Sequence, residues 1–258
     1  MTNTLSVIII TKNEALNIRA CLESVSWADE IIVVDSGSGD ETVAICREFT
    51  RRVYSHDWPG FGPQKNRALD YASGDWVLSL DADEQVTPAL RADIQNAMQN
   101  GRDAYEIPRL SSFCGRDILH SGWRPDYVTR LFKRVKGRFS DDLVHERVIV
   151  SGNTGRLQHS LLHESIRDAE DLLAKINQYS TASAIMLYDK NRTSSLKQAI
   201  AHALWAFLRS YILRAGFLDG RMGFMLAVST AENTYYRYIK LMLLTNKNQA
   251  HAKNHSHH

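Results

Sequence analysis

Short apolar runs alternate with amphipathic stretches through the first hundred residues of the chain. The apolar runs are rich in β-branched side chains and predict strands at residues 5–10, 30–35, 53–55 and 76–80. Between and after these runs, apolar residues recur every three or four positions and predict helices at residues 13–25, 40–49, 60–72 and 88–98. Strands and helices that alternate in this way predict βαβ units and a mostly parallel sheet.

The pattern changes after residue 104. Shorter apolar runs at residues 105–110, 127–133 and 147–150 predict a small antiparallel extension of the sheet. From residue 166 onward the periodicity is helical. We therefore expect an α/β fold, organised as an α/β domain over residues 1–165, an amphipathic helical region over residues 166–246 and a disordered tail over residues 247–258.

Composition narrows the class of protein. A formal net charge of +2 argues against a dedicated nucleic-acid binder. The three cysteines are odd in number and form no Cys-x-x-Cys pair, which argues against a disulfide framework or a zinc knuckle. The N-terminus lacks a basic leader, and no uncharged apolar stretch reaches the ~18 residues of a membrane-spanning helix. These features predict a cytoplasmic protein.

Positive charge is concentrated toward the C-terminus. Residues 187–258 hold ten Lys and Arg against three Asp and Glu. Within this part, residues 196–212 keep an apolar stripe for five turns, flanked by Lys197, Arg209 and Arg214. Such a helix either lies on a membrane surface or packs on its own domain. The basic balance favours the membrane surface, where anionic lipids attract Lys and Arg.

A second basic run has two interpretations. Nine Arg and Lys lie between residues 109 and 147, including Arg124 and Arg130. They form either a solvated sheet edge that charge protects from pairing or a surface that binds an anionic ligand.

Three carboxylates lie within four residues in Asp81-Ala82-Asp83-Glu84, directly after the strand that ends at residue 80. Open α/β sheets bind ligands at the carboxyl ends of their strands. Mg²⁺ is typically held by one or two carboxylates together with substrate phosphate oxygens. The cluster predicts either metal-assisted handling of a phosphorylated substrate or an acidic turn before a helix that begins at Thr87-Pro88.

Other residues with suitable chemistry lie near predicted element ends. Asp35 ends the second strand, and Lys65 lies at a helix start, where free N–H groups favour anions and its charge would assist phosphate binding. Glu146 lies on a later element, as a separate general base would. The turn after Asp35 is not a dinucleotide fingerprint, because Thr42 stands where a third glycine is needed. The sequence has no P-loop.

Four motifs together resemble those of family 2 glycosyltransferases with the GT-A fold. They are Val7-Ile8-Ile9-Ile10-Thr11-Lys12-Asn13-Glu14, Val33-Val34-Asp35-Ser36-Gly37-Ser38-Gly39-Asp40-Glu41-Thr42, Gln64-Lys65-Asn66 and Leu80-Asp81-Ala82-Asp83-Glu84. Further segments are similar to the branch that contains the lipopolysaccharide core β-1,4-glucosyltransferases acting on the first heptose. These segments are Arg130-Leu131-Phe132, Val144-His145-Glu146, Phe217-Leu218-Asp219-Gly220 and Gly223-Phe224.

The resemblance implies roles for individual residues. Those assigned to the nucleotide-sugar donor are Thr11, Glu14, Asp35, Lys65 and Asp81. Asp83 would hold Mg²⁺ or Mn²⁺ against the diphosphate, and His163 resembles a histidine that completes the metal shell. The base that activates the acceptor is placed at Glu146, with Asp142 as the competitor. Arg124 and Arg130 would meet the phosphorylated acceptor.

The implied function is inverting, metal-dependent transfer of glucose from UDP-glucose to a heptose of the lipopolysaccharide inner core. The enzyme would work on the cytoplasmic face of a bacterial inner membrane. Two alternatives stay open. One is a family 2 enzyme that uses another sugar, or a capsule, O-antigen or polyprenyl-phosphate acceptor. The other is a non-catalytic sugar-nucleotide binding protein.

Overall fold

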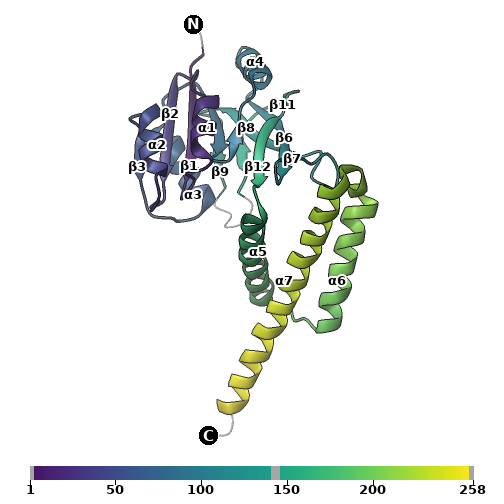
Figure 1. The fold of residues 1–258 in the computed structure, drawn as a ribbon. Helices are drawn as coiled ribbons and strands as arrows, with labels where there is room; N and C mark the ends of the chain where they lie inside the picture. The colour runs from purple at the N-terminus through teal and green to yellow at the C-terminus, as the bar shows by residue number, and fades with distance from the viewer. Residues whose placement is uncertain (1–2, 141–145, 256–258) are drawn as a thin grey trace. The chain divides into compact units, whose positions relative to one another are not determined.

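The computed structural model describes residues 3–140 and 146–255, with side chains through residue 247. The chain divides into two compact units. An α/β unit lies within Met1–Leu110 and Pro125–Glu164, and a helical unit lies within Ser111–Arg124 and Ser165–His258. Figure 1 gives the element labels used below.

Four parallel strands form the centre of the α/β unit, in the spatial order β3-β2-β1-β4. Their bounds are β1 Leu5–Thr11, β2 Glu30–Asp35, β3 Val53–Ser55 and β4 Trp76–Asp81. The accompanying helices are α1 Ile18–Ser24, α2 Thr42–Phe49, α3 Phe61–Tyr71 and α4 Pro88–Ala97. Thr87 caps α4 by accepting the Leu90 N–H at 3.1 Å. The predicted α/β class with a mostly parallel sheet is confirmed.

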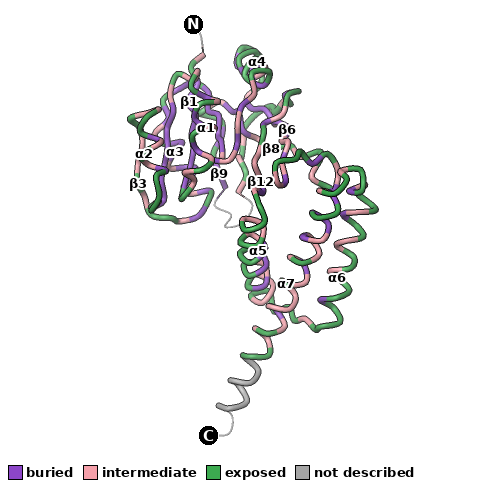
Figure 2. The backbone as a smooth tube through the Cα atoms, in the orientation of Figure 1, coloured by how far each residue is buried: buried purple, intermediate pink, exposed green. Residues whose placement is uncertain are grey.

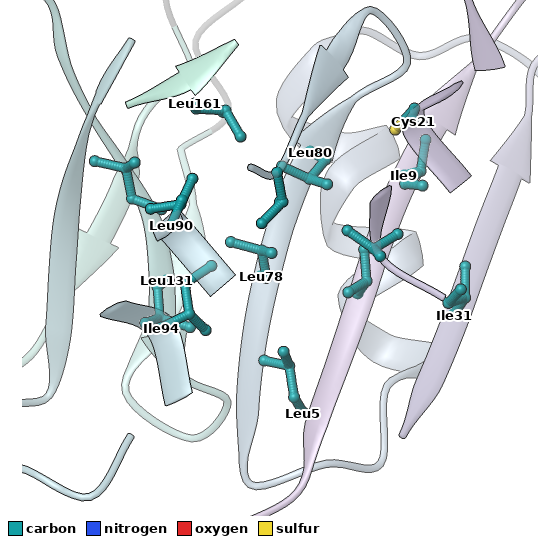
Figure 3. Close-up of a cluster of buried hydrophobic side chains, with 14 of the residues drawn as sticks. Leu5, Ile9, Cys21, Ile31, Leu78, Leu80, Leu90, Ile94, Leu131 and Leu161 are labelled. Atoms are coloured by element: carbon teal, nitrogen blue, oxygen red, sulfur yellow. The ribbon is translucent and has the colours of Figure 1, made fainter. Parts of the chain in front are cut away.

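Successive side chains of a strand point to opposite faces of the sheet, and helices cover both faces. Val7 and Ile9 of β1 belong to one core with residues of α1, α2 and α4, part of which Figure 3 shows. Ile8 and Ile10 belong to a second core with Ala68 and other residues of α3. Burial on both faces explains why the strands read as continuous apolar runs.

Antiparallel strands extend this sheet, as predicted. Beyond β4 the order continues β8-β6-β12-β5, with β7 paired antiparallel to β6 and β11 paired parallel to it, so the described residues form a ten-stranded sheet. Strands β9 and β10 form a separate antiparallel pair. The bounds are β5 Glu84–Gln85, β6 Ala104–Phe113, β7 Arg116–Asp117, β8 Tyr127–Lys133, β9 Gly137–Phe139, β10 Val148–Val150, β11 Thr154–Arg156 and β12 Leu161–Ile166.

The first helix is shorter than its apolar spacing predicts. Helix α1 begins at Ile18 rather than at residue 13, because Asn13 adopts a left-handed backbone with φ of 57°. The Asn13 side chain accepts the Gly39 N–H at 2.8 Å, and its own N–H donates to Ser38 Oγ at 2.8 Å. The residues before α1 therefore bind the turn after β2 instead of extending the helix.

The helical unit contains three long helices, of which α5 and α6 both pack against α7 (Figure 1). The bounds are α5 Ala169–Asp189, α6 Leu196–Leu208, the π-helix η1 Arg209–Leu213, the 3₁₀-helix η2 Gly216–Asp219 and α7 Gly220–His255. Ser195 and Gln198 form a capping box at the start of α6. Among the described residues, no helix is both long and apolar enough to cross a membrane.

Residues 111–124 belong to the helical unit, although strands β8, β11 and β12 of the sheet follow them in the sequence. Phe113 and Ile118 share a small core with Ile166 and Leu226. The largely buried Asp219 accepts the backbone N–H of Leu119 at 3.1 Å, and also the N–H of the following residue. These contacts tie a segment from the middle of the chain to η2.

Candidate active site

Three polar residues lie at the carboxyl ends of neighbouring strands. Thr11 ends β1 and lies in register with Asp35 of β2, while the adjacent Ile10 lies in register with Asp81 of β4. Thr11 is buried, and its Oγ1 has no hydrogen-bond partner among the described residues. This edge of the sheet, where open α/β folds bind ligands, therefore presents an unsatisfied hydroxyl on the strand that lies between those of the two acids.

The turn after β2 is held by the Asp35 carboxylate. Oδ2 of Asp35 accepts the N–H groups of Gly37 and Ser38, both at 2.9 Å, and the Ser38 hydroxyl donates to the other carboxylate oxygen. Nearby, Glu14 N–H donates to Thr42 Oγ1 at 2.8 Å. Two predicted donor residues, Asp35 and Glu14, thus belong to one polar loop cluster.

The segment Gln64-Lys65-Asn66 is buried, and each side chain has a different partner. Gln64 donates to Ser36 Oγ at 2.9 Å, which joins α3 to the turn after β2. Asn66 donates to the Phe139 carbonyl at 3.0 Å and accepts the Phe139 N–H at 2.9 Å. Helix α3 is therefore anchored both to the donor side of the sheet and to β9.

Lys65 connects two carboxylates that are 65 residues apart in the sequence. Its Nζ lies 2.9 Å from Asp81 Oδ1 and 2.8 Å from Glu146 Oε1, and its side chain is 3% exposed. The structure thus brings together the predicted donor acid and the predicted base. The ammonium contacts carboxylates in this structure, whereas the sequence predicts contact with phosphate.

The sequence predicts that Arg130 belongs to an exposed basic run, but the structure buries it between two carboxylates. Its Nη2 contacts Asp81 and lies 2.7 Å from Glu84 Oε1, and the Glu84 side chain has no exposed surface. Arg109 Nη1 lies 3.4 Å from the same Glu84 oxygen. Strand β8 is buried on both faces at this point, since Arg130, Leu131 and Phe132 are all buried, and this encloses the Arg130 side chain.

This network sets the protonation of the two acids. Burial alone would raise the pKa of the Asp81 carboxyl, but the adjacent Arg130 and Lys65 cations outweigh it and hold that pKa well below its usual range. For Glu84, burial raises the pKa, and the Arg130 charge offsets it only in part. The two cations therefore favour the ionised form of Asp81.

Asp83 and His163 form a pair at the same edge of the sheet. Strand β12 places His163 opposite Glu84 of β5, and His163 Nε2 lies 3.3 Å from Asp83 Oδ2. Within the described residues, no group of three or more His, Cys, Asp or Glu side chains could hold a metal ion. Of these two side chains, the carboxylate is the type of ligand that suits Mg²⁺ or Mn²⁺, since such sites use one or two carboxylates together with substrate oxygens and water.

Close packing fixes the position of Glu146. Its side chain is 19% exposed, and its Cβ lies 3.6 Å from where a Cβ would be at Gly62. A side chain at position 62 would clash with the Ser140 carbonyl oxygen, so only glycine permits this approach of α3. The competitor Asp142 lies outside the described residues. Arg124 is exposed and belongs to the helical unit.

Two contributors to the site were not predicted. The first is the close approach of the Gly62 backbone to the Ser140 carbonyl; the glycines on either side of Phe61 were the signal that could have indicated it. Glu84 was grouped with the metal acids, but it lies beneath Asp81 and accepts the Asp81 N–H at 2.9 Å. The position of Glu84 directly after Asp83 in the sequence does not indicate that the Glu84 side chain is buried.

Comparisons with known proteins identify chains similar to this one. The lipopolysaccharide core biosynthesis glycosyltransferase LpsC of Rhizobium meliloti (strain 1021) is 29% identical, covering 91% of this chain and 93% of LpsC. The crystal structure of S. aureus TarS (its residues 1–349) covers 94% of this chain and 92% of TarS, with a TM-score of 0.49 and 17% identity. Glucosyl-3-phosphoglycerate synthase from Mycobacterium tuberculosis, crystallised with Mn²⁺ and UDP, is 28% identical over 44% of this chain and 45% of its own, with a TM-score of 0.36.

A family model also matches residues 6–155, which include the parallel strands, α3 and Glu146. This match covers more than half of the sequence. The chain belongs to glycosyl transferase family 2.

Proposed function

We propose that this transferase moves glucose from UDP-glucose to a heptose hydroxyl of the lipopolysaccharide inner core, with inversion at the anomeric carbon. The observation that carries the proposal is the Lys65 ammonium, which touches both Asp81 at the donor edge and Glu146. A donor acid and a base held this close suit a direct displacement. Membership of family 2 supports glycosyl transfer, and the LpsC relative supports a lipopolysaccharide acceptor.

The donor is proposed to lie along the ends of β1, β2 and β4. The unsatisfied Thr11 hydroxyl and the loop cluster around Asp35 and Glu14 offer hydrogen bonds to a nucleoside. Asp81 is proposed to face the ribose, because an ionised carboxylate accepts hydrogen bonds from hydroxyl groups. Asp83 and His163 would hold Mg²⁺ or Mn²⁺, which when bound neutralises charge on a diphosphate.

Glu146 is proposed as the general base. Oε1 is engaged by Lys65, so Oε2 takes the proton from the acceptor hydroxyl. The oxygen of the acceptor hydroxyl forms a bond to the anomeric carbon as the bond from this carbon to the diphosphate oxygen breaks, and UDP leaves with the bonding electrons. The contact with Lys65 orients Glu146 for this step. No covalent intermediate with the protein is required.

A transfer assay tests the proposal directly. Purified full chain with UDP-glucose, Mn²⁺ and heptose-containing core oligosaccharide should release UDP and give a product heavier by one hexose. Asp83→Ala should lower the transfer rate at least about 100-fold, because the diphosphate loses its charge partner. Glu23→Ala, which removes an exposed carboxylate on α1, should leave the rate unchanged. UDP release without a heavier product, or equal turnover in Asp83→Ala, would contradict the assignment.

A panel of other UDP-sugars and of capsule, O-antigen and polyprenyl-phosphate acceptors completes this assay. Transfer to one of these acceptors alone would keep the transferase and replace the proposed acceptor. Donor binding without any turnover would instead favour a sugar-nucleotide binding protein.

The enzyme is proposed to bind the membrane surface through its helical unit. Exposed apolar side chains follow one another through α6, η1 and η2 into the start of α7, and Figure 2 shows α6 exposed along most of its length. They are Leu196, Ile200, Leu204, Trp205, Leu208, Ile212, Leu213, Phe217, Leu218, Phe224 and Met225. The charges exposed among residues 196–225 are basic, since the one acid, Asp219, is largely buried. Apolar and basic surface together suit an anionic bilayer.

Liposome flotation checks this surface. The full chain should float with phosphatidylglycerol-containing vesicles, and float less at high salt. The double variant Trp205→Ser/Leu208→Ser should lose most of this binding, because each side chain is about half exposed in the free protein. Val135→Ser, which changes a more exposed apolar residue of the α/β unit, should bind like wild type. Equal flotation of the double variant would refute the proposed surface.

A further inference from the structure

Two aromatic rings lie exposed at the entrance to α3. The Trp58 and Phe61 side chains are 43% and 48% exposed. Their ring centroids are 4.8 Å apart and the rings are nearly perpendicular, an edge-to-face arrangement. Neither residue belongs to the hydrophobic cores of the α/β unit. An ordered pair of exposed aromatic rings beside a polar site suits ligand contact.

The segment that carries these rings is anchored at both ends. The His56 N–H donates to the Asp35 carbonyl at 2.9 Å, and Arg67 Nη1 donates to the Asp57 carbonyl at 2.9 Å. Gly60 has a φ of 120°, which only glycine adopts readily, and its carbonyl accepts the Gln64 N–H at 3.1 Å. The rings are therefore presented by a preorganised loop.

The same segment runs from the donor edge to the base. It starts next to Asp35, and Phe61 directly precedes Gly62, the residue packed against Glu146. Glu146 must reach the hydroxyl of the acceptor, so the acceptor sugar lies beside it. Resting on the proposed function, we propose that Trp58 and Phe61 form a platform for the acceptor saccharide, against which a sugar ring packs its apolar C–H face.

The chemistry favours the acceptor over the uracil of the donor. A sugar ring combines hydroxyls, one of which Glu146 would contact, with a face of C–H groups that gains from an aromatic surface. The polar loop cluster around Asp35 and Glu14 lies on the side of the segment proposed for the nucleoside. Packing on the rings would also displace water from the side of Glu146 and restrict the orientation of the hydroxyl.

Steady-state kinetics separate these roles. Trp58→Ala should raise the KM for heptose-containing core oligosaccharide about tenfold, from loss of the aromatic contact, with the KM for UDP-glucose within about twofold of wild type. Trp58→Phe, which keeps a ring, should recover most of the loss, and Trp58→Ala/Phe61→Ala should be worse than either single variant. A rise in the KM for UDP-glucose alone would assign the rings to uracil and overturn the platform, as would unchanged kinetics.

Fluorescence titration tests binding to the platform independently of the proposed reaction. Adding the same oligosaccharide with UDP present should change the tryptophan emission of wild type, and Trp58→Phe should lose that change. If the change occurs without any transfer, the proposed reaction fails and the platform stands. If transfer occurs and the emission change persists in Trp58→Phe, the platform fails and the reaction stands. Neither binding nor transfer of this oligosaccharide would overturn both.

Discussion

Glu146→Gln is expected to lower kcat for glucosyl transfer by about 10²–10⁴-fold, the usual contribution of a general base. Glutamine keeps the size of the side chain and an oxygen that can still accept a hydrogen bond from Lys65 Nζ, now 2.8 Å from Oε1. It cannot take a proton from the acceptor hydroxyl at neutral pH. The KM for UDP-glucose should change little, because the donor edge is preserved.

Two variants make this experiment decisive. Arg147→Gln alters the adjacent exposed residue and should retain wild-type kcat. Asp142→Asn tests the competing base. Near wild-type turnover in Glu146→Gln combined with loss in Asp142→Asn would move the base to Asp142.

Arg130→Met is expected to lower the free energy of unfolding by about 3–5 kcal/mol, the cost of removing one partner from a buried ion pair. The change leaves Glu84, which has no exposed surface, and Asp81 as neighbouring carboxylates without their shared guanidinium. Methionine fills a similar volume, so the loss comes mainly from uncompensated charge. Chemical denaturation of the full chain measures it.

Paired substitutions identify the cause of that loss. Arg138→Met breaks the exposed contact with Asp70 and should shift the denaturation midpoint only slightly, since water screens such pairs. Adding Glu84→Gln to Arg130→Met should recover part of the stability by removing one stranded charge. No recovery in the double variant would mean that packing, not charge, accounts for the effect.

The parallel half of the fold could be predicted because its signals are local. Apolar runs and helical periodicity located β1 to β4 and α2 to α4 within a residue or two. The carboxyl-end positions of Asp35 and Asp81 followed from the same pattern. Helix α1 was misplaced at its start because the loop partners of Asn13 lie 25 and 26 residues away, where periodicity carries no information.

The contacts within the site depend on tertiary packing that no local pattern encodes. Lys65 and Glu146 are separated by 81 residues, and their pairing depends on how α3 approaches Ser140. Arg130 belongs to a run of basic residues, and its burial follows from the packing that covers both faces of β8 rather than from the composition of that run. The pairing of Asp83 with His163 likewise requires β12 to lie beside β5.

The missing side chain at Gly62 has a consequence for how specificity changes in such an enzyme. Because the backbone of α3 meets the backbone of Ser140 there, the approach of α3 to the segment before Glu146 is set by the scaffold. Trp58 and Phe61 lie just outside this contact and can vary without shifting it. Acceptor preference and chemistry are thus carried by neighbouring but separately mutable parts, so a lineage can exchange one sugar for another while its catalytic geometry is inherited intact.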